Sequence, residues 1–275
     1  MSFVDLHVHS NASDGTLPPE QVARLAHEAG LSAIALTDHD TTAGVAKAMD
    51  AGKELGLEVV PGIEVSSSFR DHEIHILGLF ADTTSPSLQA ALKEFRLRRD
   101  QRNREMLERF DAHGIRLTAE ELCAGNPDTV ITRAHVARAL LAKGLGPDLD
   151  HIFKKYLKYG GPYCPPKEFL PPEAVMEALL DSHAFVALAH PFQYKLGDRA
   201  TDELIAYLAG LGMKGLEVYH SSHNRLESAK LQVMAARHGL LPTGGSDFHG
   251  SKQPDNSIGT GRGGLRVSSL LVDSI

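Results

Sequence analysis

Two histidines near the start of the chain are separated by a single residue. His7 and His9 lie in the run Asp5-Leu6-His7-Val8-His9, where apolar and polar residues alternate as they do in a β-strand. Because side chains alternate in direction along a strand, both imidazoles point to one face and can reach one cation. Surface strands also carry such pairs by chance, so the metal interpretation depends on the rest of the chain.

Further histidines and carboxylates follow or lie within the other predicted strands. They are Asp14, His39, Glu64, His75, His190, Asp247 and His249. In barrels of alternating strands and helices, the active site is built at the carboxyl ends of the strands, where most of these residues fall. Each one alone has an ordinary explanation, such as turn formation by Asp14 before Gly15. Their joint occurrence indicates that these residues bind metal together.

These nine residues offer imidazole nitrogens and carboxylate oxygens but no sulfur. The number of ligands suffices for two or three divalent cations, with positions left for water, and the donor types favour Zn, Mn or Fe. Two or three such cations carry more charge than three carboxylates cancel, so the cluster would attract a phosphate. The chemistry expected is hydrolysis of a phosphoester by a metal-activated water, without a separate seryl or cysteinyl nucleophile.

Short β-type runs alternate with amphipathic helices, which predicts a parallel α/β sheet or barrel. The predicted strands are residues 4–9, 33–38, 58–64, 74–80, 185–190, 215–219 and 241–246. Helices are predicted from about Pro18 to Gly30 and over 45–55, each ended by a glycine. Residues 265–272 are a candidate last edge element.

The alternation stops between residues 81 and 184, where a helical pattern replaces it. A long helix is predicted over 87–113, followed by a capping box at 118–121 and a helix that starts near Thr132. The Gly- and Pro-rich residues 159–166 form a loop that returns the chain. We therefore predict a barrel formed by residues 1–82 and 184–275, with a mostly helical insert at 83–183 that contributes to substrate binding.

Composition excludes several classes of protein. A net charge of −7 argues against a surface for long nucleic acid, although a small anion still fits a local positive pocket. No apolar run approaches the roughly 20 residues of a membrane span, and the first residues lead directly into the first motif. We expect a soluble, cytoplasmic protein with no membrane partner. Cys123 and Cys164 are the only cysteines, and we expect no disulfide between them.

Five motifs in order along the chain carry a resemblance to a known family. They are Asp5-Leu6-His7-Val8-His9-Ser10, Thr37-Asp38-His39-Asp40, Pro61-Gly62-Ile63-Glu64, Ala189-His190-Pro191 and Gly245-Ser246-Asp247-Phe248-His249. Together they resemble the PHP (polymerase and histidinol phosphatase) family of the amidohydrolase-like superfamily. The resemblance covers the barrel elements, from about residue 4 to 80 and from 185 to 249. It implies a distorted seven-stranded barrel, in agreement with the strand count.

The resemblance also implies how the ligands group and what they do. One site would take His7, His9, Glu64 and Asp247, a second would share Glu64 with His75 and His190, and a third would take Asp14, His39 and His249. Two or three divalent ions are implied, with Mn expected first and Zn or Fe as alternatives. Within the family the chain is most similar to enzymes that hydrolyse 3′,5′-bisphosphonucleotides and trim short RNA from its 5′ end. A small phosphorylated nucleotide or short oligonucleotide is therefore the expected substrate.

Two arginines interrupt the apolar face of the long predicted helix. Arg99 and Arg102 continue the helical spacing of its apolar residues, and an unpaired buried guanidinium is costly. We interpret them as part of a second phosphate site, the alternative being that they pair with carboxylates of the insert or reach solvent. Arg133 and His135 follow the predicted N-cap Thr132, where a helix start favours an anion; ordinary capping with a surface arginine is the alternative.

Two other functions stay open at this point. A histidinol phosphatase would share the fold and the metals but would not need a second anion site. A non-catalytic regulatory module would keep the metals for stability, although a complete ligand set argues against it. His220 and His223 follow the sixth strand near the expected mouth of the barrel, and a substrate contact is conceivable there.

Overall fold

The computed structural model describes residues 2–123, 129–166, 168–250 and 255–275. Its strands form one sheet in the order β7-β6-β5-β4-β3-β2-β1-β8. The strands are β1 (Phe3–Val8), β2 (Ala33–Leu36), β3 (Glu58–Phe69), β4 (His72–Leu79), β5 (Phe185–Leu188), β6 (Gly215–His220), β7 (Leu241–Gly245) and β8 (Val267–Ser268). All seven predicted strands are confirmed, and the predicted edge element contains β8.

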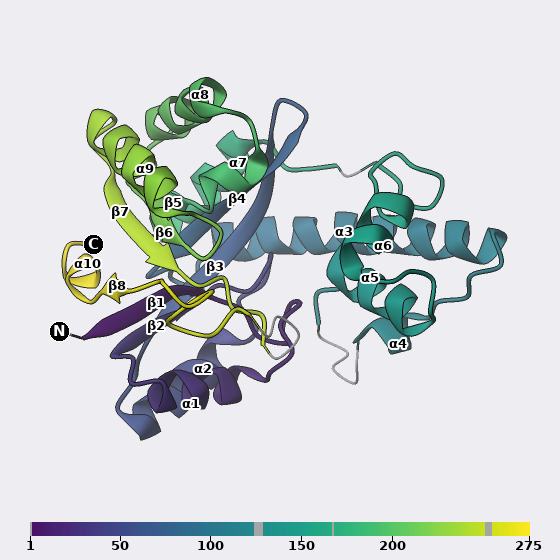
Figure 1. The fold of residues 1–275 in the computed structure, drawn as a ribbon, viewed down its shortest axis with the longest axis horizontal. Helices are drawn as coiled ribbons and strands as arrows, with labels where there is room; N and C mark the ends of the chain where they lie inside the picture. The colour runs from purple at the N-terminus through teal and green to yellow at the C-terminus, as the bar shows by residue number, and fades with distance from the viewer. Residues whose placement is uncertain (1, 124–128, 167, 251–254) are drawn as a thin grey trace.

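The sheet curls into a nearly closed barrel (Figure 1). Closure occurs just after β7, where the backbone N–H of Asp247 donates to the His7 carbonyl oxygen at 2.9 Å and that of His9 donates to Phe248 at 2.9 Å. The beginning of β1 pairs instead with β8, antiparallel, through Phe3 and Ser268. The fold class predicted from the sequence, an α/β barrel, is therefore confirmed.

One strand runs against the expected parallel arrangement. β4 is antiparallel to both β3 and β5, because β3 and β4 form a hairpin in which Phe69 faces His72. The prediction that the third strand ends at Glu64 was wrong, since residues 66–68 continue the strand and pair with residues 73–75. Three consecutive serines suggest a turn, but backbone pairing with β4 keeps them extended. The reversal brings the start of β4, with His75, to the end of the barrel where the parallel strands finish.

Helices cover the outside of the barrel and build a second lobe (Figure 1). In the described residues they are α1 (Pro19–Glu28), α2 (Val45–Leu55), α3 (Pro86–Ala112), α4 (Ala119–Cys123), α5 (Arg133–Ala142), α6 (Leu149–Tyr156), α7 (Pro172–Asp181), a 3₁₀ turn η1 (Pro191–Tyr194), α8 (Asp198–Gly210), α9 (Arg225–Arg237) and α10 (Leu270–Asp273). Both predicted helices before β3 are confirmed. The long helix and the helix after Thr132 are confirmed as well, and Thr132 caps α5 with its hydroxyl.

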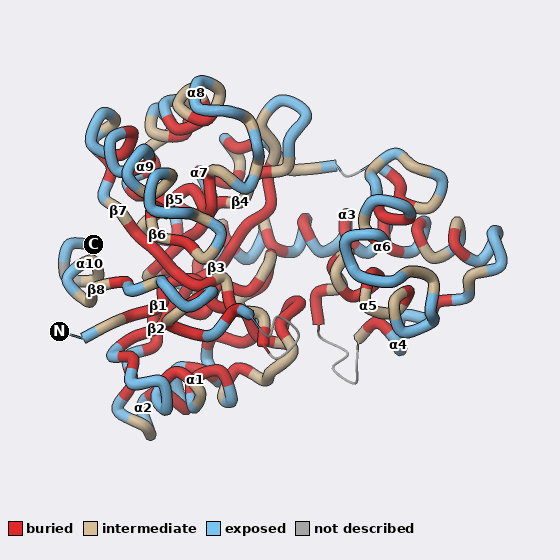
Figure 2. The backbone as a smooth tube through the Cα atoms, in the orientation of Figure 1, coloured by how far each residue is buried: buried red, intermediate tan, exposed pale blue. Residues whose placement is uncertain are grey.

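The barrel and the second lobe have separate apolar cores, and α3 takes part in both. Near its start, Leu88 and Leu92 pack with the barrel, whereas Met106 and Phe110 belong to the core shared with α5 and α6. The tube in Figure 2 alternates between buried and exposed along α3, as expected for a helix packed on one side. The division at residues 82/83 and 183/184 stays a prediction, but α7 packs with the barrel core through residues such as Leu179. Among the described helices, none combines the length and apolar character that a membrane span needs.

Barrel closure leaves no room for a side chain at Gly245, which yields a testable prediction. A Cβ at this position would lie 2.4 Å from the backbone nitrogen of His7 and 2.4 Å from its Cβ, so two strands would have to separate. We expect Gly245→Ala to destabilise the protein by about 1–3 kcal/mol, the usual range for overpacking. The control is Gly210→Ala at the end of α8, where a Cβ meets nothing within 4 Å. Equal urea midpoints for the two variants would contradict this description of closure.

Candidate metal centre

The mouth of the barrel holds a cluster of buried histidines and carboxylates around Glu64. This residue lies in the middle of β3 and is 0% exposed. Its Oε2 lies 3.4 Å from Nε2 of both His7 and His9, which β1 presents on one face as predicted. Its Oε1 lies 3.0 Å from Nδ1 of His75 and 2.9 Å from Nε2 of His190. Three separate segments of the barrel, namely β1 with the residue after it, β4 and the loop after β5, thus converge on one carboxylate.

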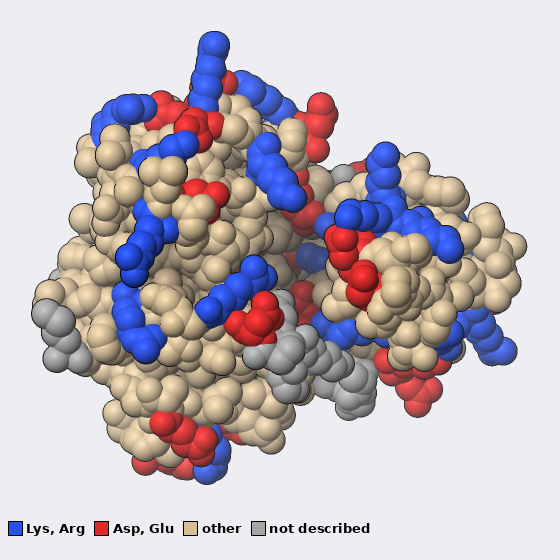
Figure 3. Space-filling view, in the orientation of Figure 1, with Lys and Arg blue, Asp and Glu red and all other residues tan. Residues whose placement is uncertain are grey.

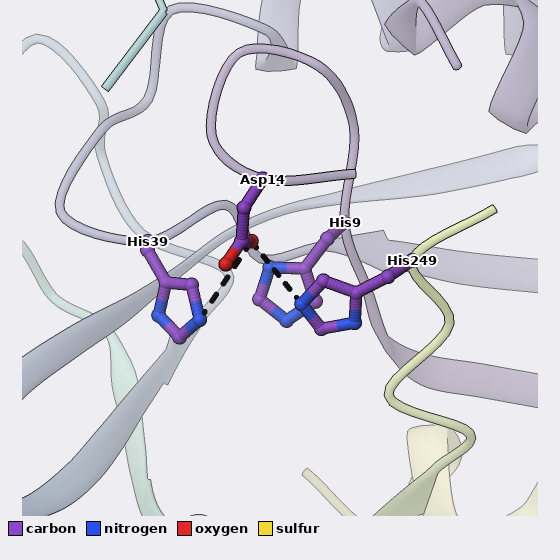
Figure 4. A group of neighbouring side chains, drawn as sticks. All are labelled: His9, Asp14, His39 and His249. Carbon is purple, nitrogen blue, oxygen red and sulfur yellow. Dashed lines mark ion pairs between the residues drawn. The ribbon is translucent and has the colours of Figure 1, made fainter. Parts of the chain in front are cut away.

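A second group forms around Asp14 in the loop after β1. Nε2 of His249 lies 3.1 Å from Asp14 Oδ1, and Nε2 of His39 lies 3.9 Å from the same oxygen. Figure 4 shows Asp14 between these two imidazoles, with His9 beside them. One ligand atom from each of the four residues lies within 4.8 Å of the other three, which is the spacing expected of ligands around one cation.

Asp247 joins the two groups from the loop after β7. Its Oδ1 lies 3.2 Å from Nε2 of His9, 3.5 Å from Nε2 of His7 and 3.5 Å from Nδ1 of His249. All nine residues predicted as ligands are therefore brought together at one end of the barrel. Among the described residues, four groups of ligand atoms are close enough to hold a metal ion; three of them consist only of predicted ligands, and the fourth combines His7 and Asp247 with His220.

The cluster suits divalent cations for reasons beyond proximity. Several buried ligand atoms have no hydrogen-bond partner among the described residues, including Nε2 of His7, both ring nitrogens of His9 and Oε2 of Glu64. Buried polar atoms are normally satisfied, so such a set facing one space indicates an ion. The donors are nitrogen and oxygen only, which fits Zn, Mn or Fe. The grouping implied by the family differs from these four groups, because His9 lies with Asp14, and His39 lies with both Asp14 and Glu64. How the nine residues divide among ions stays a prediction.

The charges in the cluster shift one another strongly. Burial alone would raise the pKa of the Glu64 carboxyl, but the adjacent imidazoles, His39 foremost, hold it well below its usual range. Burial opposes protonation of His7, yet the carboxylates, Glu217 foremost, raise its pKa well above normal. Burial lowers the pKa of His9 to about 3. Some imidazoles thus offer a free lone pair to a cation, and others must release a proton when one binds.

A layer of polar residues that was not predicted from the sequence lies behind the cluster. Glu217 of β6, 0% exposed, accepts from Nδ1 of His7 at 2.9 Å and from the backbone N–H of His190 at 2.7 Å. Asp38 accepts from Ser10 and Ser13 hydroxyls and so fixes the first loop. A carboxylate in the middle of the apolar strand Gly-Leu-Glu-Val was the available signal for Glu217. Such partners orient metal-binding imidazoles.

The predicted substrate arginines fall into two situations. Arg99 is buried and pairs with Asp40, which belongs to the barrel and directly follows His39. Arg102 is 7% exposed; it donates to Asn103 Oδ1 at 3.0 Å, and its Nε has no partner among the described residues. The alternative of pairing with acids of the insert is thus wrong for Arg99, and for Arg102 no carboxylate partner occurs in the described part of the chain.

Arg133 and His135, both predicted to bind substrate, lie at the start of α5. Only Arg133 faces the space next to the cluster. Arg133 lies 3.8 Å above the Tyr159 ring and 3.2 Å from Glu73. Thr132 donates through Oγ1 to Asp14 at 3.1 Å, which connects the insert directly to the cluster. His135 instead accepts the backbone N–H of Thr132 at 3.0 Å as part of the helix cap. That geometry gives His135 a capping role, and this side chain does not line the space.

A cavity of about 150 Å³ joins the metal cluster to the arginines. One wall carries Asp14, His39 and His75, and the other carries Arg99, Arg102 and Arg133. Figure 3 shows side chains of both charges along the hollow between the barrel and the helical lobe. A molecule with two anionic groups could therefore place one at the cluster and the other at the arginines.

Comparison with known proteins agrees with this site. The PHP domain model matches residues 5–163. The 3′,5′-nucleoside bisphosphate phosphatase of Chromobacterium violaceum is 35% identical over 261 residues, 94% of this chain and 91% of that protein. The 5′-3′ exoribonuclease Rnm of Escherichia coli is 35% identical over 263 residues, 94% of this chain and 88% of that protein. A solved structure from Bifidobacterium adolescentis, whose name predicts a metal-dependent phosphoesterase, matches with a TM-score of 0.89 at 30% identity, covering 100% of this chain and 95% of that one.

The central position of Glu64 predicts the effect of removing its charge. Glu64→Gln keeps the shape of the side chain but leaves several imidazoles without their shared carboxylate. We expect the variant to retain fewer metal ions per chain by mass spectrometry and to lose phosphate-releasing activity. Glu203→Gln, which alters a partly exposed acid paired with Arg70 and outside the cluster, is the matched control. Full metal content in Glu64→Gln would show that Glu64 is not a ligand.

Proposed function

This chain belongs to the PHP domain family, and from that membership we propose that it removes the 3′-phosphate from nucleoside 3′,5′-bisphosphates, leaving the 5′-monophosphate. The chain is a metal-dependent phosphoesterase, a hydrolase of phosphoric esters. We propose trimming of short oligonucleotides from the 5′ end as an additional activity, because a relative with that activity is equally similar. Two or three ions, with Mn expected first, would occupy the cluster around Glu64.

The observation that carries the choice of substrate is the buried cation Arg102. A guanidinium with only an amide oxygen as partner is costly to bury unless an anion completes its hydrogen bonds. Arg102 lines the same cavity as His39 and His75. A substrate with an anionic group at Arg102 could therefore place its second anionic group at the cluster. A nucleoside with phosphates on its 3′ and 5′ oxygens has this separation of charges. Histidinol phosphate has one phosphate and leaves Arg102 unsatisfied.

The residues of this chain have distinct tasks in that reaction. Bound divalent cations supply positive charge to the reacting phosphate and acidify the attacking water. Arg99 and Arg133 are held in place by Asp40 and Glu73, so their orientation precedes substrate binding. Arg102 remains to contact the 5′-phosphate. The Thr132–Asp14 hydrogen bond fixes the position of the insert relative to the cluster, so the residues that bind the two phosphates are in place before the substrate arrives.

Phosphate release from four substrates tests this function directly. Metal-stripped protein is reconstituted with Mn²⁺ and assayed with adenosine 3′,5′-bisphosphate, 3′-AMP, 5′-AMP and histidinol phosphate. We expect a strong preference for the bisphosphate and 5′-AMP as the product. A preference for histidinol phosphate would contradict the second phosphate site while keeping the cluster. No phosphate release from any of the four substrates would contradict the proposed function.

Replacing Arg102 separates substrate recognition from folding. Arg102→Met removes the charge and keeps the apolar stem, and apolar replacements of buried charges are often neutral or stabilising. We expect kcat/KM for the bisphosphate to fall about 10- to 150-fold, the equivalent of one charged hydrogen bond of about 1.5–3 kcal/mol. The value for 3′-AMP, which lacks the 5′-phosphate, should change little. The thermal midpoint should stay constant or rise.

Arg104→Met is the matched control for this experiment. Arg104 is exposed on the same helix, two residues away, and should tolerate the change without effect on either substrate. Arg99→Ala is less informative because it would leave Asp40 buried without its partner and so destabilise the fold. Equal losses for bisphosphate and monophosphate in Arg102→Met would show that Arg102 does not bind the second phosphate.

A further inference from the structure

The end of β6 contains an irregularity that turns an unexpected side chain toward the metal centre. The register between β6 and β7 shifts between Glu217 and Tyr219, as in a β-bulge. In a regular strand, Glu217 and His220 would point to opposite faces, because they are three residues apart. With the bulge, both are buried on the cluster side, at 0% and 3% exposure, and Tyr219 packs against the apolar clusters. Bulges of this kind often re-aim a side chain beside an active site.

His220 is held in a single tautomer by its own loop. The backbone N–H of Ser222 donates to Nδ1 of His220 at 3.0 Å, and the Ser222 hydroxyl lies 2.8 Å from the same nitrogen. A backbone amide can only donate, so Nδ1 must be the acceptor. The proton of the neutral ring is therefore on Nε2. A protonated nitrogen cannot bind a metal, so this geometry argues against His220 as a ligand although it lies among the ligands.

The protonated nitrogen faces the outer oxygen of Asp247. Nε2 of His220 lies 3.5 Å from Asp247 Oδ2, too long for a full hydrogen bond, and it has no other partner among the described residues. Oδ1 of the same carboxylate faces His9 and His7. Asp247 has a backbone φ of +56°, a conformation that residues other than glycine rarely adopt. Such a conformation persists only where surrounding contacts fix the residue in place. The backbone of Asp247 therefore fixes where its side chain begins, and Nε2 of His220 approaches the Oδ2 atom of that side chain.

We propose that His220 is a positioning residue that orients Asp247 toward the metal ions and is not itself a ligand. The role parallels that of Glu217, which acts from the same bulge on His7. One strand irregularity thus supplies two outer partners, an acceptor for an imidazole and a donor for a carboxylate. Loss of such partners typically costs 10- to 100-fold in metal affinity. The inference concerns metal binding and holds whatever phosphoester the protein hydrolyses.

Metal affinity of three variants tests the proposal without substrate. In His220→Gln, the amide nitrogen can take the place of Nε2 and still donate to Asp247, whereas His220→Ala removes the donor. We expect His220→Ala to bind Mn²⁺ about 10- to 100-fold more weakly in a chelator competition. His220→Gln should recover most of this affinity, and both variants should reach the wild-type number of ions at saturating Mn²⁺. Tyr219→Phe, on the opposite face of the bulge, is the control and should bind like wild type.

Kinetics add a second readout. The arginines contact the substrate away from His220, so His220→Ala should lower kcat and leave KM for the bisphosphate nearly unchanged. Wild-type Mn²⁺ affinity in His220→Ala would overturn the proposal. Loss of one ion per chain at saturation in both His220 variants would overturn it as well, because His220 would then be a ligand. These outcomes are independent of the substrate panel, since affinity and stoichiometry are measured on the protein alone.

Discussion

The burial of Glu64 is the constraint on which the rest of this structure depends. A carboxylate with no solvent contact requires positive charge or donors on every side, since removing one partner of a buried pair costs about 3–5 kcal/mol. Here the partners come from β1, from the loop after β2, from β4 and from the loop after β5. These strands bring their partners to Glu64 only because the sheet from β1 to β5 is curled. The burial of Glu64 and the curl of the sheet are therefore two consequences of the same arrangement.

Three of the polar contacts that connect the helical lobe to this arrangement involve residues lining the cavity. Arg99 pairs with Asp40, Arg133 pairs with Glu73, and Thr132 donates to Asp14. Each barrel partner is either a predicted ligand or lies within two residues of one. An insert attached in this way can contribute to substrate binding without a separate domain interface. It also explains why a chain with a net charge of −7 can bind a phosphorylated substrate, because the positive charge is concentrated in one cavity.

Backbone strain and outer polar partners complete the site. Asp40, His190 and Asp247 all have positive φ. Asp40 directly follows His39, and His190 and Asp247 are members of the cluster that lie two residues after β5 and β7. Such conformations persist where surrounding contacts determine them, and they concentrate at functional sites. Glu217 contacts His7 through a hydrogen bond that exists without any ion, so this imidazole of the cluster is already oriented. A preorganised cluster of this kind binds a cation with little rearrangement.

The sequence alone determined which residues form the cluster, because their types and their positions after strands are local properties. It also determined the ends of the helices that it predicted, since a cap such as Thr132 or a terminating glycine such as Gly56 acts on its own helix. Only the tertiary structure decided the direction of β4, the pairing of Arg99 with Asp40 and the inward turn of His220. Each depends on a partner distant in sequence: a neighbouring strand, a loop of the barrel, and the register between β6 and β7. Local pattern cannot encode these, because strand register and ion pairing are chosen by the packing of the whole barrel.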